Sequence, residues 1–210
     1  AGMAVLQPDG VLERVRIMGK VQVLADAMRE VDLSGTTGIA HTRWATHGKP
    51  CEGNAHPHLS SDEVAVVHNG IIENHDALRA ALSEAGYTFS SETDTEVVVH
   101  LIHSHYAKDP SLLRAVRAAA AEMKGAFSLA VLHRSHPEEL VAFRKGSPLV
   151  VGLGVDEQFV ASDALALRGF AQSMIYLEEG DSARITPSRV ELFDVNNEVV
   201  VYGSLYKISS

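Results

Sequence analysis

The sequence predicts a single α+β domain. Its 210 residues suit one domain, and the balance of 46% hydrophobic and 21% charged residues is ordinary for a globular core and surface. Strand patterns occur in runs with helical patterns bunched between them, which argues against a regular βαβ alternation. No repeat, low-complexity stretch or flexible linker divides the chain, so residues 1–210 are expected to form one unit.

The first quarter of the chain predicts strands around one helix. Residues 1–5 have a strand-like pattern, and residues 11–17 alternate apolar and polar side chains, as a half-buried strand does. Apolar residues at helical spacing predict a short amphipathic helix over 21–31. Residues 38–46 are rich in β-branched and aromatic side chains and predict a strand that feeds a loop at 48–50.

The middle of the chain predicts a buried strand and three helices. The strand covers 64–68 and is expected to end at Asn69-Gly70, a pair that favours sharp turns. The first helix is expected from Asn74 to Ala85, with Gly86 just beyond its end. The second is expected to begin at the capping-box sequence 93–96. The third is expected to begin with Asp109 as its cap and Pro110 in first position, and to end at Gly125.

Short strands fill the rest of the chain, separated by glycine, proline and charged residues. We expect them at 127–132, 140–143, 149–151, 158–161, 174–177, 183–185 and 190–193.

Composition narrows the possible partners. The net charge is −9 and the acidic residues are spread along the chain, so no basic surface for nucleic acid is expected. No apolar run approaches the roughly 20 residues of a membrane helix. The single cysteine excludes an intramolecular disulfide and fits a reducing, cytoplasmic compartment.

Eleven histidines invite a metal interpretation, which their spacing does not support. His103 and His105 do not face the same side of a helix. His100 and His103 share a face but lack a nearby partner, and we expect them at the surface or its boundary. His56 and His58 share a face if extended, yet no further ligand stands at a usual spacing. We therefore predict no metal.

The lone thiol, Cys51, lies in a turn-like loop close to Lys49. A lone cysteine is a possible nucleophile on general grounds, but no base is paired with it in the sequence. We expect an incidental loop cysteine.

Three further segments carry functional groups. Residues 43–48 combine an arginine fork for a carboxylate with threonine and backbone donors, or they form an ordinary edge strand. Asn69 and Gly70 would provide donors for an oxyanion, or a simple turn. Asp94 would meet an ammonium group, or stabilise a helix start.

Together these segments resemble a known family. Ile39-Ala40-His41-Thr42-Arg43-Trp44-Ala45-Thr46-His47-Gly48, Asn54-Ala55-His56-Pro57-His58, Val67-His68-Asn69-Gly70-Ile71-Ile72-Glu73-Asn74 and Ser91-Glu92-Thr93-Asp94-Thr95-Glu96 follow in this order. The series resembles the glutaminase domains of glucosamine-6-phosphate synthases, and Gly146–Val150, Phe159–Asp163 and Leu177–Asp181 extend the likeness over almost the whole chain.

The resemblance implies a four-layer αββα sandwich of the N-terminal-nucleophile (Ntn) hydrolase type. It implies hydrolysis of glutamine to glutamate and ammonia without a cofactor, the ammonia passing to a sugar-isomerase domain to make glucosamine 6-phosphate. It also implies that the full-length enzyme is a homo-oligomer.

The resemblance also implies roles for particular residues. Arg43, helped by Thr46 and His47, would hold the α-carboxylate of glutamine, and Asp94 its α-ammonium. The side chain of Asn69 and the N–H of Gly70 would form the oxyanion hole. Trp44 resembles the family's lid and ammonia gate, and His56 matches a position near the glutamine pocket.

The family's nucleophile is an N-terminal cysteine whose own amino group is the base. Residues 1–5 resemble a family segment about thirty residues after it, so we expect the first strand, that cysteine and the following helix upstream of Ala1.

Two alternatives remain open. One is another amidotransferase of the same fold, such as the purine-pathway phosphoribosyl enzyme or an asparagine synthetase. The other is a module that binds glutamine or glutamate without catalysis, which would need no nucleophile.

Overall fold

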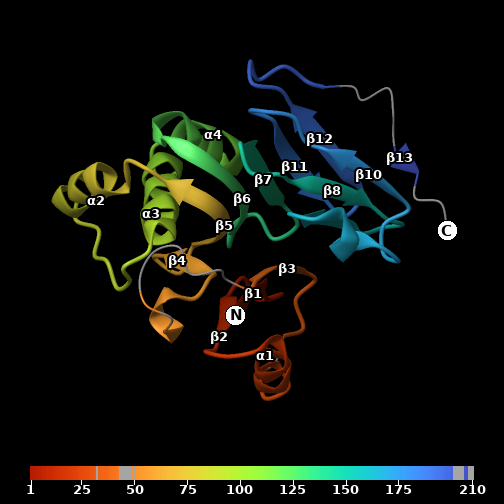
Figure 1. Ribbon diagram of the computed structural model, residues 1–210, viewed down its shortest axis with the longest axis horizontal. Coiled ribbons are helices and arrows are strands. Elements are labelled where there is room, and N and C mark those ends of the chain that lie inside the picture. The colour runs from red at the N-terminus through yellow and green to blue at the C-terminus, as the bar shows by residue number, and fades with distance from the viewer. Residues whose placement is uncertain (32, 43–48, 50, 201–205, 208–210) are drawn as a thin grey trace.

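The structure, a computed structural model, describes residues 1–31, 33–42, 49, 51–200 and 206–207 (Figure 1). Its described strands form three antiparallel sheets.

The largest sheet has six strands in the order β12-β11-β7-β6-β5-β4. The strands of this sheet are β4 (His58–Ser60), β5 (Val64–Ile72), β6 (Gly125–His133), β7 (Leu140–Lys145), β11 (Ser182–Thr186) and β12 (Arg189–Phe193). The long strands β5 and β6, which three helices separate in the sequence, pair without interruption from Val64↔His133 to Ile72↔Gly125, and they form the centre of the molecule.

Two smaller sheets have the orders β2-β1-β3 and β13-β10-β8-β9. Their strands are β1 (Gly2–Leu6), β2 (Leu12–Arg16), β3 (Thr37–His41), β8 (Val150–Leu153), β9 (Gln158–Ala161), β10 (Ser173–Tyr176) and β13 (Tyr206–Lys207). In the described part of the chain, β3 and β9 are each the last strand of their sheet.

Alternating side chains divide the core between the two faces of the central sheet. Val64 and Val66 of β5 pack in one cluster with residues of α3 and α4, whereas Ala65 packs with Ala4 and Ile39 of the first small sheet. The second small sheet packs along β7 and β11 through a third cluster that includes Val151 and Ala183. This separation follows from the two-residue period of a strand. The two small sheets therefore lie on one face, and the helical residues of 75–122 lie on the other.

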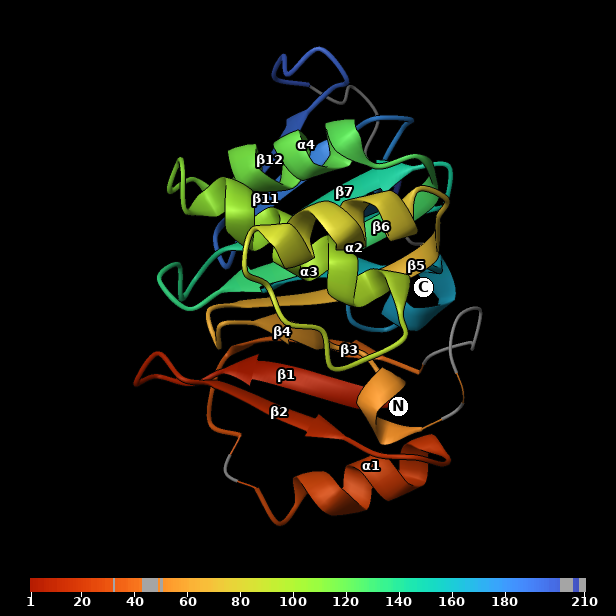
Figure 2. The ribbon, with the colours of Figure 1, turned by 90° about the vertical axis from the view of Figure 1, so that its left-hand side faces the viewer.

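The helices are α1 (Val21–Met28), α2 (His75–Glu84), α3 (Asp94–Tyr106) and α4 (Leu112–Glu122), with 3₁₀ turns at Glu52–Asn54 and Ala164–Leu167. Figure 2 shows α2, α3 and α4 together on one side of β5, β6 and β7, with α1 at the opposite end beside β2. None of the described helices is long and apolar enough to cross a membrane.

Several predictions about element ends are wrong; the helix predicted over 21–31, for example, ends at Met28. The strand predicted to stop at 68 continues through Asn69 and Gly70, which pair with Ser128 and Phe127 instead of turning, because β6 offers partners along the whole length. The third long helix is capped by Ser111, whose hydroxyl accepts from the backbone N–H of Arg114, and not by the expected Asp109. Asp109 instead pairs with the Arg114 side chain at 2.6 Å.

A trench separates the facing edges of β3 and β9. A cavity of about 640 Å³ is lined by Thr36–Gly38 on one side and Gln158–Val160 on the other. A smaller cavity of about 90 Å³ follows, between Ala40-His41 and Val160–Ser162. Its floor is the central sheet, including Asn69. The two small sheets thus form one layer that is interrupted over β5 and β6.

Candidate active site

Asn69 lies where the trench meets the central sheet. Its neighbours Val67 and Ala65 alternate toward the small sheets, and Asn69 follows the same alternation on β5. The residue lines the smaller cavity together with His41 and Ser128. An amide side chain is therefore presented to the space between the layers.

Gly70 adopts a backbone conformation that other residues rarely reach, with φ of +115°. A Cβ at this position would lie 2.0 Å from the carbonyl oxygen of Ala126 on β6. The glycine is therefore required by its own backbone torsion and by the close approach of the neighbouring strand.

Asp94 is the first residue of α3 and is 3% exposed. Its Oδ2 atom accepts a hydrogen bond from the backbone N–H of Ile72 at 2.9 Å, and its Oδ1 atom lies 4.0 Å from Nδ1 of His68. The carboxylate thus joins the end of β5 to the start of α3. Its position also gains from the positive end of the helix dipole, so the helix-start role proposed from sequence is present.

His56 is held in its loop by two arginines of β2. Arg16 donates to the carbonyl oxygens of Gly53 and Ala55 at 3.0 and 3.2 Å, and Arg14 donates to that of Pro57 at 3.3 Å. Burial, followed by the charge of Arg16, lowers the pKa of Arg14 to about 10, so it remains a cation near neutral pH. Both guanidinium groups therefore fix the backbone on either side of His56.

Three hydrogen bonds link His56, Thr95 and His68 and indicate which nitrogen of His56 carries the proton. The backbone N–H of His68 points to Nδ1 of His56 at 3.5 Å, so that nitrogen accepts. Nε2 of His56 then donates to Thr95 Oγ1 at 2.9 Å, and this hydroxyl donates to Nδ1 of His68 at 3.0 Å. The neutral form of His56 with the proton on Nε2 satisfies every contact in this set.

His41 extends the set to Asn69. Its ring stacks on that of His56 with centroids 4.3 Å apart. Its Nε2 atom lies 2.6 Å from Oδ1 of Asn69. Since a carbonyl oxygen only accepts, Nε2 of His41 is the donor. The contacts therefore run from Asn69 through His41 and His56 to Thr95 at the start of α3.

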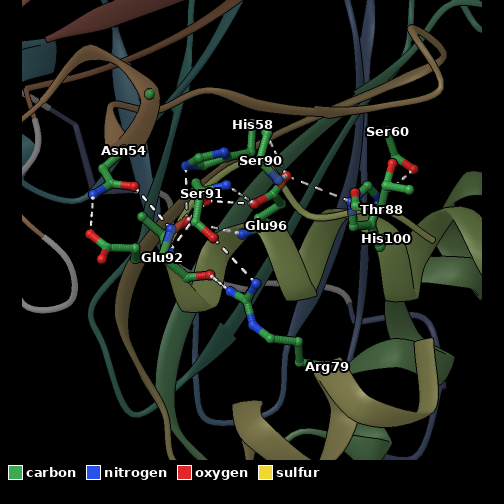
Figure 3. Close-up of polar contacts among 12 residues, drawn as sticks. Asn54, His58, Ser60, Arg79, Thr88, Ser90, Ser91, Glu92, Glu96 and His100 are labelled. Atoms are coloured by element: carbon green, nitrogen blue, oxygen red, sulfur yellow. Dashed lines mark hydrogen bonds and ion pairs between the residues drawn. The ribbon is translucent and has the colours of Figure 1, made fainter. Parts of the chain in front are cut away.

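Figure 3 shows how the loop before α3 is attached to the His56 loop. Asn54 and Glu92 exchange two hydrogen bonds of 3.0 and 3.2 Å. Thr93 accepts from Glu96 N at 3.3 Å, as its capping-box role predicted, and lies 3.0 Å from Nε2 of His58. These contacts fix the start of α3 relative to the His56 loop.

Glu96 does not complete the capping box but turns to the preceding loop. Its carboxylate accepts from the backbone and hydroxyl groups of Ser90 and Ser91, at 2.6 to 2.8 Å. Burial alone would raise the pKa of Glu96. The His100 ring and the groups of Ser90 and Ser91 outweigh burial and lower that pKa well below its ordinary range. The carboxylate is thus a charged anchor for the loop.

The other candidates have ordinary surroundings. Cys51 is exposed and free. His100 is buried and binds Ser60 at 2.8 Å and the Thr88 carbonyl at 3.1 Å, so the surface or boundary position expected for it is wrong. Nothing resembling a metal site, with three or more His, Cys, Asp or Glu side chains together, occurs in the part of the chain that the structure describes.

Four of the predicted site residues, Arg43, Trp44, Thr46 and His47, lie outside the described residues. The structure brings together Asn69, His56 and Asp94 through the intervening His41, Thr95 and His68. Sequence reasoning gave His41 no role of its own. Its position two residues after the buried Ile39 was the signal that its side chain faces the central sheet.

Comparison with known proteins identifies the family of the chain. The family described as "Glutamine amidotransferase domain" matches residues 41–169, more than half of the chain. The chain belongs to the glutamine amidotransferase domain family. The matched range of this glutamine amidotransferase domain includes His41, Asn69, Gly70 and Asp94.

Curated relatives of the glutamine amidotransferase domain carry the name glutamine--fructose-6-phosphate aminotransferase [isomerizing]. The protein from Legionella pneumophila is 61% identical over 210 residues, which are 100% of this chain and 35% of that protein. The Pseudomonas aeruginosa protein is 54% identical over 200 residues, or 95% of this chain and 33% of that protein. The chain therefore spans about a third of the length of these relatives.

Solved structures confirm the fold prediction. A glutamine phosphoribosylpyrophosphate amidotransferase from B. subtilis superposes with a TM-score of 0.73 at 24% identity, over 94% of this chain and 43% of that chain. A glutamine aminotransferase class-II domain protein from Silicibacter pomeroyi gives a TM-score of 0.65 at 18% identity, over 92% and 90% of the two chains. The α+β sandwich of the Ntn amidotransferases is thus the fold. The purine-pathway alternative shares this fold but is far less similar in sequence than the sugar-phosphate aminotransferases.

Proposed function

We propose that this domain hydrolyses L-glutamine to glutamate and ammonia in a pocket at the Asn69 end of the trench. The observation that carries the proposal is the placement of Asn69 and Gly70, which lie side by side on β5 where the trench reaches the central sheet. Polar donors at such a position stabilise the oxygen of a tetrahedral intermediate, where negative charge develops.

Substrate recognition in this proposal depends on two opposite charges. Arg43, with Thr46 and His47, binds the α-carboxylate of glutamine, and Asp94 binds its α-ammonium. The Ile72 N–H already holds Oδ2 of the buried Asp94 carboxylate, and its Oδ1 lies 4.0 Å from Nδ1 of His68, so the charge is fixed in place at the start of α3. This pair selects free glutamine over a glutamine within a peptide. Trp44 closes the pocket as a lid, and His56 supports its wall.

The nucleophile in this proposal is the thiol of a cysteine that precedes Ala1 and begins a strand lying in the trench. Its thiolate attacks the side-chain carbonyl carbon of glutamine, while its own amino group takes the thiol proton. The oxyanion is held by the Asn69 amide and the Gly70 N–H. Collapse of the intermediate breaks the carbon–nitrogen bond, and the amino group returns the proton to the departing ammonia. Water then cleaves the thioester and releases glutamate.

The wider role that we propose follows the relatives' printed name. Ammonia from this domain would be transferred to fructose 6-phosphate in a sugar-isomerase domain of the full-length, homo-oligomeric protein. The 61% identity to such aminotransferases supports this assignment over other amidotransferases of the same fold. We also propose a cytoplasmic location, which suits the exposed free thiol of Cys51.

A glutaminase assay on protein with a verified N-terminus tests the proposal. Intact mass and N-terminal sequencing establish which residue comes first, and glutamate release is then measured with and without fructose 6-phosphate. We expect turnover only when an upstream cysteine is the first residue. Turnover by protein that begins at Ala1 would refute the nucleophile assignment. Glutamine binding without turnover, in protein that begins with the cysteine, would identify a binding module instead.

A further inference from the structure

We propose that His41 is a positioning residue for the oxyanion hole, acting through the side-chain amide of Asn69. The inference rests on the proposed glutaminase function and adds to it a residue that acts through the Asn69 side chain. His41 ends β3 in one layer of the sandwich, and Asn69 lies on β5 in the other. The 2.6 Å contact between them therefore bridges the two layers beside the trench.

The chemistry of an amide explains why this bridge matters. The two ends of an asparagine amide differ, since the oxygen only accepts hydrogen bonds and the nitrogen only donates them. An oxyanion requires the nitrogen. A donor fixed on the oxygen side holds the amide in one of its two orientations and directs the nitrogen away from His41. Nε2 of His41 supplies that donor.

The surroundings of His41 fix its own ring. One face stacks on His56, whose plane is inclined by 27°. His56 is in turn held between the backbone N–H of His68 and the hydroxyl of Thr95. Two bonds at its opposite nitrogens restrain the His56 ring, and the stack restrains His41 above it. The contacts that run from Thr95 of α3 through His56 and His41 therefore fix the orientation of the Asn69 amide before glutamine binds.

This arrangement predicts a loss in kcat without a matching change in KM. Removing an oxyanion donor costs about 10²–10³ in rate. A misdirected amide loses part of the same stabilisation, so His41→Ala is expected to lower kcat by at least about tenfold. The KM for glutamine should stay within about threefold, because the groups proposed to hold the amino-acid end are unchanged.

Two substitutions separate the donor of His41 from its ring. His41→Gln keeps an N–H donor on a side chain of similar reach and removes the stacking ring. His41→Phe keeps the ring on His56 and removes the donor. Glutaminase kinetics of the full-length protein should therefore show His41→Gln within a few-fold of the wild type and His41→Phe as slow as His41→Ala. The opposite order would show that the ring acts only in packing and would overturn the proposal.

A double-mutant cycle completes the test. If His41 acts through Asn69, the pair His41→Ala and Asn69→Ala should be no slower than Asn69→Ala alone. Losses that multiply in the pair would overturn the positioning role while leaving the oxyanion hole intact. An unchanged kcat in Asn69→Ala would overturn the oxyanion assignment itself, and the proposal for His41 with it. Melting temperatures of all variants identify any that lose activity by unfolding.

Discussion

Replacing Gly70 by alanine tests the geometry of the central strand, because two separate costs meet at this position. The φ of +115° is unfavourable for any residue with a Cβ, at about 1–3 kcal/mol. The added Cβ would also lie 2.0 Å from a backbone oxygen of β6, which has no flexible end to move aside. Overpacking of this kind costs about a further 1–3 kcal/mol.

Two other glycines separate these costs. Gly86 has φ of +95° and nothing within 4 Å of its Cβ position, so Gly86→Ala carries the torsional cost alone, about 1–2 kcal/mol. Gly53 has open space around its Cβ position and no such φ, so Gly53→Ala is expected to be near neutral. In thermal unfolding of the full-length protein, the melting temperature should be highest for Gly53→Ala, lower for Gly86→Ala and lowest for Gly70→Ala. For a domain of this size each kcal/mol corresponds to about 2–4 °C.

Gly70→Ala should also impair catalysis beyond its effect on stability. A shift of β5 away from β6 at Gly70 displaces the adjacent Asn69 amide, so glutaminase kcat should fall at temperatures where the protein is still folded. If Gly70→Ala and Gly86→Ala have the same melting temperature, the close approach of β5 and β6 at Gly70 is wrong. If it melts lower but keeps full kcat, the oxyanion role of this segment is wrong.

Three further predictions concern substrate binding and pH. Arg43→Ala should weaken glutamine binding far more than Cys51→Ser, measured by calorimetry or as KM, because only the arginine is proposed to pair with the substrate carboxylate. Asp94→Asn should raise the KM for glutamine at least about tenfold with little loss of stability, since an amide oxygen still accepts from the Ile72 N–H while the charge is lost. Lowering the pH from 6.5 to 4 should reduce the free energy of unfolding more in the wild type than in the His133→Asn variant, because the variant lacks this buried titrating group.

The sign of the pH effect follows from the pKa of His133. Burial, and to a lesser extent the charge of His136, lower this pKa from 6.5 to about 4. The unfolded chain therefore takes up a proton first as the pH falls, and stability is lost between these two values. A difference of about 2.5 units corresponds to about 3 kcal/mol. Equal acid sensitivity of wild type and His133→Asn, in urea unfolding at several pH values, would refute this account.

Equal effects of Arg43→Ala and Cys51→Ser on glutamine binding would count against the proposed pocket. For Asp94→Asn, a lower melting temperature with unchanged KM would show that the carboxylate serves only to join β5 to α3.

Local patterns predicted much of the fold. Alternation placed β2 within its predicted range, and 158–161 coincides with β9. The Thr93 cap of α3 also follows from local chemistry. Where tertiary pairing decides, the sequence was insufficient. Asn69-Gly70 has a turn composition, yet its pairing with β6 keeps it in the strand. The site needed the family resemblance, because His41 and Asn69 come from different sheets and no spacing relates them.

The composition of the two strands that border the trench predicts whether the isolated domain associates with itself in solution. Exposed edge strands usually carry charges or proline, which prevent them from adding strands of other molecules. Neither β3 (Thr37–His41) nor β9 (Gln158–Ala161) contains Lys, Arg, Asp, Glu or Pro. Both have the composition of interior strands, which form backbone hydrogen bonds with a neighbouring strand on each side. These 210 residues prepared alone should therefore self-associate along the two edges, and a strand supplied to the trench should keep them apart.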